Sequence, residues 1–298
     1  MNLKSKLNKL EFKNPITTAS GTFGYEMSNY VDFDNLGAIV TKTITKERKA
    51  GNPSPRLFET EWGLLNSIGL QNPGVESFIK DSLPHYEAYK TPLLVSFSGS
   101  TQEEFIEVLT RLETVDSIAG YEVNVSCPNV KNEGIAFGVD AKVVKELTSQ
   151  LRKLTDKELI IKLTPNVTNI VEIAHAAKEG GADSLALINT LLGMAIDPMT
   201  GKSRINRRLC GYSGSAIKPV ALANVYRVAQ AVDIPILAMG GAENYLDVLE
   251  FLYAGASLVA IGTANFYNPM VINEIISDLT NHFNKYDLTV EKIRGKIS

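Results

Sequence analysis

The chain is poor in cysteine, in long apolar runs and in charge of one sign. It has only two cysteines in 298 residues, Cys127 and Cys210. Two thiols are too few for a disulfide framework, a structural zinc site or an iron–sulfur cluster, which needs about four thiolates. No stretch approaches the roughly 18 uncharged apolar residues of a membrane span. The net charge of −3, from 30 Lys and Arg against 33 Asp and Glu, excludes a nucleic-acid binder that relies on bulk positive charge.

The N-terminal residues carry no visible targeting signal. Residues 1–11 are rich in lysine and asparagine and lack the apolar segment of a signal peptide. Few cysteines are typical of proteins from reducing compartments. We therefore expect a soluble, cytoplasmic protein that binds neither membranes nor nucleic acid and has no metal site of its own.

Eight short runs of apolar and β-branched residues recur along the chain. They cover residues 16–19, 38–41, 93–97, 121–125, 159–163, 184–188, 234–238 and 257–261. Such nearly continuous apolar runs are typical of parallel strands that are covered on both faces. Stretches of helical period lie between most of them, at residues 102–112, 141–154, 170–178, 216–231 and 245–254.

This alternation predicts an α/β fold, a closed (β/α)8 TIM barrel. A doubly wound open sheet is the alternative, although its signature Gly-x-Gly-x-x-Gly does not follow the first strand. Residues 45–91 form a long segment rich in Gly, Pro and Asn, which marks a functional loop more often than a separate domain. No linker divides the chain, so we expect residues 1–298 to form one domain.

Glycines follow the last two predicted strands, as Gly240-Gly241 and as Gly262-Thr263. In barrels the chemistry lies at the carboxyl ends of the strands, and the loops after strands seven and eight often bind phosphate through backbone N–H groups. Alternatively, these glycines only permit tight turns. Because both turns carry the feature together, we favour a phosphorylated ligand or cofactor.

Two lysines, Lys42 and Lys162, lie at strand ends where both side chains would enter the mouth of the barrel. A lysine within an apolar strand is costly to bury unless it has a partner. Two converging cations suit a planar group that gains negative charge, such as a reduced flavin or an enolate. An internal salt bridge is the alternative.

Cys127 lies just past the fourth predicted strand, in Asn124-Val125-Ser126-Cys127-Pro128-Asn129. A lone cysteine is more often buried and structural, which is how we interpret Cys210. The position of Cys127 at a strand end, before a segment with Gly134 and Gly138, favours an accessible thiol under a closing loop. No histidine is near in sequence, so an acid/base role suits this thiol better than a Cys/His dyad.

Taken together, these motifs resemble the class 1 dihydroorotate dehydrogenases, flavin barrels of pyrimidine biosynthesis. The likeness runs from about residue 7 to about residue 276. It is carried by Thr18-Ala19-Ser20-Gly21, Lys42-Thr43, Gly51-Asn52-Pro53, the run Asn66-Ser67-Ile68-Gly69-Leu70-Gln71-Asn72-Pro73-Gly74, the Cys127 motif, Ile161-Lys162-Leu163, Asn189-Thr190, Ser213-Gly214, Gly240-Gly241 and Gly262-Thr263. Each motif alone is weak, but the set is specific.

The resemblance implies an FMN across the barrel mouth and orotate beside it. The positions that match flavin-binding residues are Ser20, Lys42, Thr43, Asn124, Lys162, Ile188, Gly214, Gly240, Gly241, Gly262 and Thr263. Those that match substrate-binding residues are Lys42, Asn66, Ser67, Ile68, Gly69, Leu70, Asn124, Asn129, Asn189 and Thr190. Asparagines suit this ligand, because a carboxamide both donates and accepts and can pair with the alternating C=O and N–H groups of a pyrimidinedione.

The same resemblance implies the chemistry. Cys127 would remove the C5 proton of dihydroorotate while hydride passes from C6 to flavin N5, and activity should rise with pH as thiolate forms. Lys162 and Lys42 would stabilise the negative charge of the reduced flavin. Class 2 enzymes carry serine in place of this cysteine and have a membrane-associating extension, so Cys127 argues for class 1.

Two loops resemble the NAD-linked subtype, Ile68–Gly74 and Tyr212–Pro219. This subtype is a heterotetramer of two catalytic chains, which form a homodimer core, and two electron-transfer subunits with FAD and a [2Fe–2S] cluster. A chain with two cysteines cannot hold such a cluster itself, so its electrons must leave through a partner.

One position departs from that subtype, and three rival functions stay open. Ser96 stands where NAD-linked relatives usually carry an asparagine that touches the flavin, and the fumarate-linked subtype tends to carry serine there. The rivals are a fumarate-linked enzyme, a dihydropyrimidine dehydrogenase-like flavin enzyme, and a non-redox barrel that binds a phosphorylated metabolite.

Overall fold

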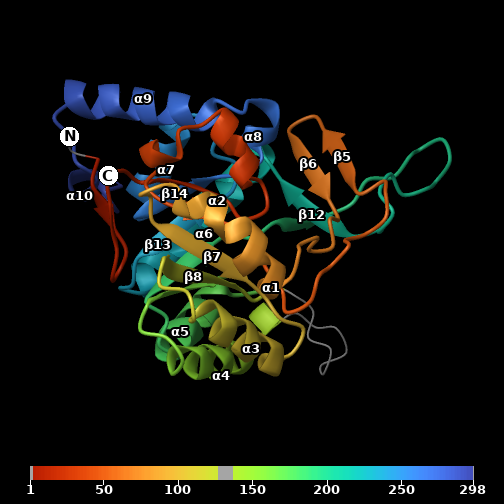
Figure 1. The fold of residues 1–298 in the computed structure, drawn as a ribbon. Coiled ribbons are helices and arrows are strands. Elements are labelled where there is room, and N and C mark those ends of the chain that lie inside the picture. The colour runs from red at the N-terminus through yellow and green to blue at the C-terminus, as the bar shows by residue number, and fades with distance from the viewer. Residues whose placement is uncertain (1–2, 127–136, 298) are drawn as a thin grey trace.

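The computed structural model describes residues 3–126 and 137–297, and its centre is a barrel of eight parallel strands (Figure 1). The strands are β3 (Ile16–Thr18), β4 (Ile39–Val40), β7 (Leu93–Phe97), β8 (Ile118–Asn124), β9 (Glu158–Lys162), β10 (Ser184–Leu187), β13 (Ile236–Met239) and β14 (Leu258–Ile261). Their order is β3-β14-β13-β10-β9-β8-β7-β4, and each corresponds to one predicted run. The prediction of a (β/α)8 barrel is confirmed, and the open-sheet alternative is wrong.

The barrel closes where β3 and β4, the two ends of this strand order, meet. A parallel bridge joins Thr17 to Ala38, and the Thr17 hydroxyl donates to the Ala38 carbonyl oxygen over 2.8 Å. The Thr18 hydroxyl donates to the carbonyl oxygen of Val40 and accepts from its N–H. Threonine side chains thus replace part of the backbone ladder and satisfy buried polar groups at this joint.

Helices surround the barrel and follow the strands, as predicted. The long ones are α3 (Gln102–Leu112), α4 (Ala141–Arg152), α5 (Ile170–Glu179), α6 (Lys218–Ala231), α7 (Tyr245–Ala254) and α9 (Val271–Lys285), with short helices α1 (Val75–Ser77), α2 (Leu83–Glu87), α8 (Ala264–Tyr267) and α10 (Val290–Ile293). Side-chain oxygens of Thr101, Asp140, Asn169 and Asn244 cap four of the starts. In the described part of the chain, no helix has the length and apolar character to cross a membrane.

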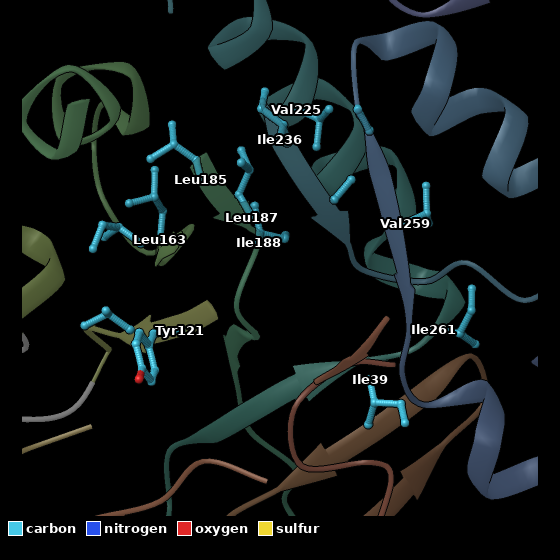
Figure 2. Packing of buried hydrophobic residues seen from close by; sticks show 14 of the residues in the cluster. Ile39, Tyr121, Leu163, Leu185, Leu187, Ile188, Val225, Ile236, Val259 and Ile261 are labelled. Carbon is cyan, nitrogen blue, oxygen red and sulfur yellow. The ribbon is translucent and has the colours of Figure 1, made fainter. Parts of the chain in front are cut away.

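Alternation along each strand divides the core into an outer and an inner layer. In β9, Leu159 and Ile161 belong to the outer cluster, which packs between the strands and the helices. Figure 2 shows members of this cluster, among them Tyr121, Leu185 and Val259. Ile160 belongs to the inner cluster instead, which fills the barrel. This strand therefore carries Lys162 and Glu158 on its inward-facing side as well.

A hairpin covers the amino-terminal end of the barrel. Its strands β1 (Ser5–Lys6) and β2 (Glu11–Phe12) are antiparallel, and Leu7 and Phe12 pack into the inner cluster. The buried carboxylate of Glu158 accepts hydrogen bonds from the N–H of Lys9 and the hydroxyl of Ser184. The hairpin thus closes one end of the inner layer with both apolar and polar contacts.

A four-stranded antiparallel sheet stands beside the barrel in Figure 1. It contains β5 (Leu57–Thr60), β6 (Gly63–Asn66), β11 (Leu191–Gly193) and β12 (Cys210–Ser213), in the order β11-β12-β6-β5. Cys210 packs in a small cluster with Leu65 and Ile205, which fits the expected structural role. The segment that sequence analysis treated as a loop therefore supplies two strands of this sheet, together with α1 and α2.

Candidate functional site

A cavity of about 1150 Å³ opens at the carboxyl ends of the barrel strands. Every described residue that the sequence singled out for flavin or substrate lines it, namely Ser20, Lys42, Thr43, Asn66, Ser67, Ile68, Gly69, Leu70, Asn124, Lys162, Ile188, Asn189, Thr190, Gly214, Gly240, Gly241, Gly262 and Thr263. Cys127 and Asn129 lie outside the described residues. Parallel strands place their carboxyl ends on one rim, which is why residues so far apart in sequence meet here.

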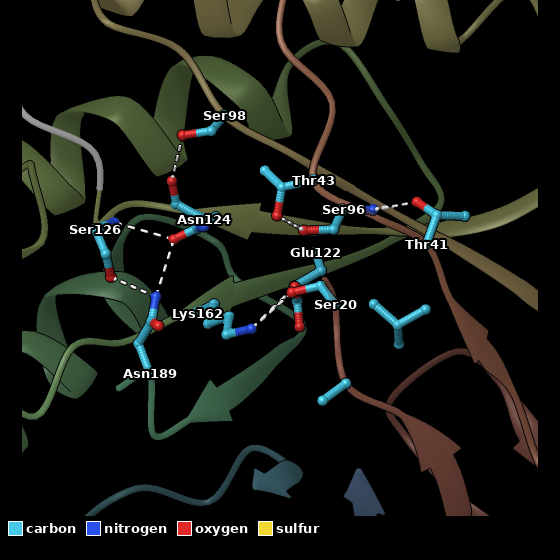
Figure 3. A network of polar contacts seen from close by, with 12 residues as sticks. Ser20, Thr41, Thr43, Ser96, Ser98, Glu122, Asn124, Ser126, Lys162 and Asn189 are labelled. Atoms are coloured by element: carbon cyan, nitrogen blue, oxygen red, sulfur yellow. Dashed lines mark hydrogen bonds and ion pairs between the residues drawn. The ribbon is translucent and has the colours of Figure 1, made fainter. Parts of the chain in front are cut away.

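Lys162 enters this cavity from the end of β9 and is almost fully buried, with 4% of its surface exposed. Its ammonium donates to Ser20 Oγ over 2.8 Å and lies 3.4 Å from Glu122 Oε1 on β8 (Figure 3). The internal ion pair that we considered for this lysine is therefore present. Because Lys162 also lines the cavity, the pair does not remove it from reach of a ligand.

Lys42, the second lysine, follows β4 and faces the same cavity. Burial lowers the pKa of its ammonium, and the positive charges of Lys162 and Arg56 lower that pKa further. No ion-pair partner of Lys42 is found among the described residues. An anionic ligand would supply the missing counter-charge, so the cavity is electrostatically prepared for one.

Hydrogen bonds fix the amide side chains at the ends of β8 and β10. Asn189 Nδ2 donates to Asn124 Oδ1 over 3.2 Å and to Ser126 Oγ over 2.9 Å (Figure 3). Asn189 Oδ1 accepts from the N–H of Thr190. These contacts orient both carboxamides before any ligand binds. Ser126, which sequence analysis did not select, lines the cavity and completes this network.

Ser96 on β7 is fully buried and does not line the cavity. Its hydroxyl is 3.0 Å from Thr43 Oγ1, and Thr43 is a lining residue. Its backbone N–H donates to the hydroxyl of Thr41. Ser96 therefore lies behind the cavity wall and contacts the lining residue Thr43.

The ends of β13 and β14 form a wall of small residues. Gly241 has a φ of +84°, and a Cβ added there would lie 2.7 Å from the carbonyl oxygen of Gly214. Glycine is therefore required at this point for both conformation and space. Thr263 Oγ1 donates to Ser213 Oγ on β12 over 2.8 Å, which ties the barrel rim to the antiparallel sheet. Ser213 also lines the cavity; it belongs to the Ser213-Gly214 motif but was not selected as a site residue from the sequence.

The antiparallel sheet delivers residues 66–70 to the cavity from outside the barrel. Asn66 ends β6 and pairs with Gly211 on β12, and its Nδ2 donates to the Gly211 carbonyl oxygen over 3.4 Å. Ser67 is held by Asn52 Nδ2, which donates to its hydroxyl over 2.9 Å. The cavity thus has one wall from the barrel and another from this sheet.

The combined site has room and polarity for a cofactor together with a substrate. Its volume exceeds the roughly 300–1,000 Å³ of a pocket for one drug-sized ligand. It offers two ammonium groups, several carboxamides and a glycine wall that lets an anion approach the backbone closely. These features fit a planar, phosphorylated cofactor such as a flavin nucleotide. In the described part of the chain, no group of His, Cys, Asp or Glu residues forms a candidate metal site.

Comparisons with known proteins agree with this chemistry. A family model described as dihydroorotate dehydrogenase matches residues 2–283. Three similar proteins carry the name dihydroorotate dehydrogenase B (NAD(+)), catalytic subunit. The one from Alkaliphilus metalliredigens is 48% identical over 300 residues, covering 100% of this chain and 99% of the relative. The one from Desulforamulus reducens is 50% identical over 284 residues (95% and 93%), and the one from Malacoplasma penetrans is 47% identical over 288 residues (96% and 94%).

The close contact of Gly241 with Gly214 leads to a prediction about stability. Gly201→Ala is a matched control, because Gly201 also has a positive φ, +66°, but nothing lies within 4 Å of an added Cβ. We expect Gly201→Ala to cost about 1–2 kcal/mol from its backbone conformation alone. Gly241→Ala must in addition displace the backbone of Gly214, so its cost should be larger. Urea unfolding of both variants measures the difference, and equal costs would contradict the close approach.

Proposed function

The chain belongs to the dihydroorotate dehydrogenase family, and from this we propose that its cavity binds FMN and oxidises dihydroorotate to orotate. Members of this family are oxidoreductases of pyrimidine biosynthesis, and membership implies a flavin cofactor. The observation that carries the proposal is the common cavity, in which the residues matched to flavin and those matched to substrate form one continuous lining.

The flavin would lie against the barrel side of the cavity. Gly240, Gly241, Gly262 and Thr263 would hold its phosphate through backbone N–H groups, as expected at the last two strands of such a barrel. Lys162, anchored on Ser20, would place a positive charge beside the ring. When bound, the flavin supplies the acceptor for the hydride that leaves the substrate.

The substrate would lie between the flavin and the wall formed by residues 66–70. Asn124 Nδ2 would donate to the pyrimidinedione and Asn189 Oδ1 would accept from it, because both protons of Asn189 Nδ2 are already bound by Asn124 and Ser126. Lys42 would pair with the substrate carboxylate, which provides the counter-charge that no described residue supplies to it. The carboxylate is also what separates this substrate from dihydrouracil.

We propose Cys127 as the base that removes the C5 proton of dihydroorotate. It directly follows Ser126, whose hydroxyl accepts a hydrogen bond from Asn189 in the cavity. A thiol with an ordinary pKa of about 8.5 is partly ionised near neutral pH and can accept a proton as the thiolate. Asn129 would contribute to substrate binding from the same segment.

We further propose that electrons leave through a partner subunit to NAD. The similar proteins named above are catalytic subunits, which implies a partner subunit. The proposed partner carries FAD and a [2Fe–2S] cluster, and two such partners join a homodimer of catalytic chains. A cytoplasmic location suits this function, because thiols such as Cys127 stay reduced there.

Removing the proposed base gives a direct test of the mechanism. Cys127→Ala should retain bound FMN, seen in its visible spectrum, and lose dihydroorotate oxidation by at least about 100-fold, within the range for general base catalysis. Cys210→Ala is the matched control, since Cys210 packs in a cluster of the antiparallel sheet, and it should keep its activity. Near-normal turnover by Cys127→Ala would overturn the assignment of the base.

The lowered pKa of Lys42 predicts how orotate binding depends on pH. Below that pKa the ammonium is charged and binds the carboxylate, and as the pH rises through it the attraction is lost. Lys42→Ala should weaken orotate by roughly 10- to 100-fold at neutral pH, the value of a charge-assisted hydrogen bond. Lys42→Arg keeps its positive charge at all relevant pH values. Its affinity for orotate should therefore not fall over the pH range in which the wild type loses the proton of Lys42.

Titration of the flavin spectrum with orotate measures these affinities. Dihydrouracil, which has no carboxylate, is the control ligand, and Lys42→Ala should leave its affinity nearly unchanged. Equal loss with both substrates would place the role of Lys42 away from the carboxylate. Equal turnover of dihydrouracil and dihydroorotate by the wild type would favour the dihydropyrimidine dehydrogenase-like alternative.

Purification of the native, untagged complex tests the electron route. We expect a yellow-brown assembly in which a second chain carries FAD and iron, and which reduces NAD with dihydroorotate. A homodimer of this chain alone that reduces fumarate would establish the fumarate-linked alternative instead. A colourless protein that stays colourless with added FMN would favour the non-redox barrel.

A further inference from the structure

Glu122 is a carboxylate buried inside the barrel that the mechanism above leaves without a role. It lies on β8, with Ser96 as its neighbour on β7 and Ile160 as its neighbour on β9, and it has no exposed surface. Oε1 lies 3.4 Å from the ammonium of Lys162. Oε2 has no hydrogen-bond partner in the part of the chain that the structure describes.

Stability does not explain this carboxylate. The inner cluster around it is apolar and includes Val40, Leu94, Ile160 and Ala186. A buried ion pair is often no more stabilising than apolar residues of similar size, and a buried oxygen without a hydrogen-bond partner is destabilising. An apolar pair would therefore have served packing at least as well as Glu122 and Lys162.

Glu158, the other fully buried glutamate of the barrel interior, shows the difference. Both of its oxygens accept hydrogen bonds, Oε1 from Ser184 Oγ and Oε2 from the N–H of Lys9, at the end that the hairpin closes. Glu158 is therefore part of a satisfied structural network. Glu122 lies instead beside the cavity, and among the described residues its one charged contact is with Lys162, which lines the cavity.

Glu122 is the counter-charge of Lys162, as the groups around this lysine show. Lys42, beyond β4, is a second cation in the same cavity, and Lys162 is one cause of its lowered pKa. On the β10 side, the strand partner of Lys162 is Ala186, and on the β8 side it is Asn124. Among the described residues, Glu122 is the only acidic group paired with Lys162.

We propose that Glu122 is a positioning residue, which holds the ammonium of Lys162 in place and directed at the flavin ring. Glu122 on β8 and Ser20, in the turn that follows β3, then hold the ammonium between them, and the aliphatic stem of Lys162 lies in the barrel interior (Figure 3). This inference rests on the proposed flavin function. Its consequence is that Glu122 controls the reduction potential of the flavin without touching it.

The decisive variant is Glu122→Gln, which keeps the shape of the side chain and removes its charge. A buried ammonium that loses its counter-charge gives up its proton or turns away from the low-dielectric interior. Either change removes positive charge from beside the reduced ring, so the flavin should become harder to reduce. At a fixed applied potential, we expect the ratio of reduced to oxidised flavin to fall at least about tenfold, which is about 30 mV for a two-electron couple.

Two further variants separate positioning from structure. Glu158→Gln should lower the free energy of unfolding and leave the potential unchanged, because Glu158 lies in the network at the closed end. Glu122→Asp keeps the negative charge and should retain most of the wild-type potential. Dye-coupled reductive titration of the FMN-loaded protein measures the potential, and urea unfolding measures stability.

Introducing Glu122→Gln into a Lys162→Met background tests whether the effect passes through the lysine. If Glu122 acts through Lys162, the second substitution should leave the potential of Lys162→Met unchanged. A shift of equal size in both backgrounds, or an unchanged or raised potential in Glu122→Gln alone, would overturn the inference while the proposed function stands. A wild-type chain that holds no flavin would overturn both.

Discussion

The burial of the Lys162 ammonium is the constraint around which the barrel interior is arranged. A charge cannot leave water at low cost, and the strands around it supply mostly hydrocarbon. Glu122 on one side and Ser20 on the other provide the two polar contacts that the structure shows for it. The same constraint acts on Lys42, which burial and two neighbouring cations leave in need of an anion. The arrangement of charges in the protein therefore favours negatively charged ligands.

Most of the barrel follows from local patterns in the sequence. Strands buried on both faces, such as residues 159–163, are apolar nearly throughout, and capped helices such as α3 begin and end where the predicted segment does. The site residues could be named because they follow these strands, and because a specific family resemblance covers the motifs. Their contacts with ligands stay predictions, and Cys127 and Asn129 lie outside the described residues.

What sequence analysis missed depends on long-range pairing. The strands of the antiparallel sheet have three or four residues each, and β6 pairs with β12 although Asn66 and Gly211 are 145 residues apart. No local pattern encodes such a pairing. Glu122 was missed for a different reason. Like Lys162, it is a charged residue within an apolar run, but only Lys162 was selected as a site residue from the sequence. Ser126 and Ser213 have no signal of their own, because serines near strand ends are common.

The hairpin closes the amino-terminal end of the barrel, so the two ends of the barrel have different roles. At the closed end, Leu7 and Phe12 complete the packing, and both carboxylate oxygens of Glu158 accept hydrogen bonds. At the open end, polar side chains line the cavity in which we propose that the ligands bind. Substitutions at the closed end of the barrel should therefore change thermal stability while the reaction stays the same.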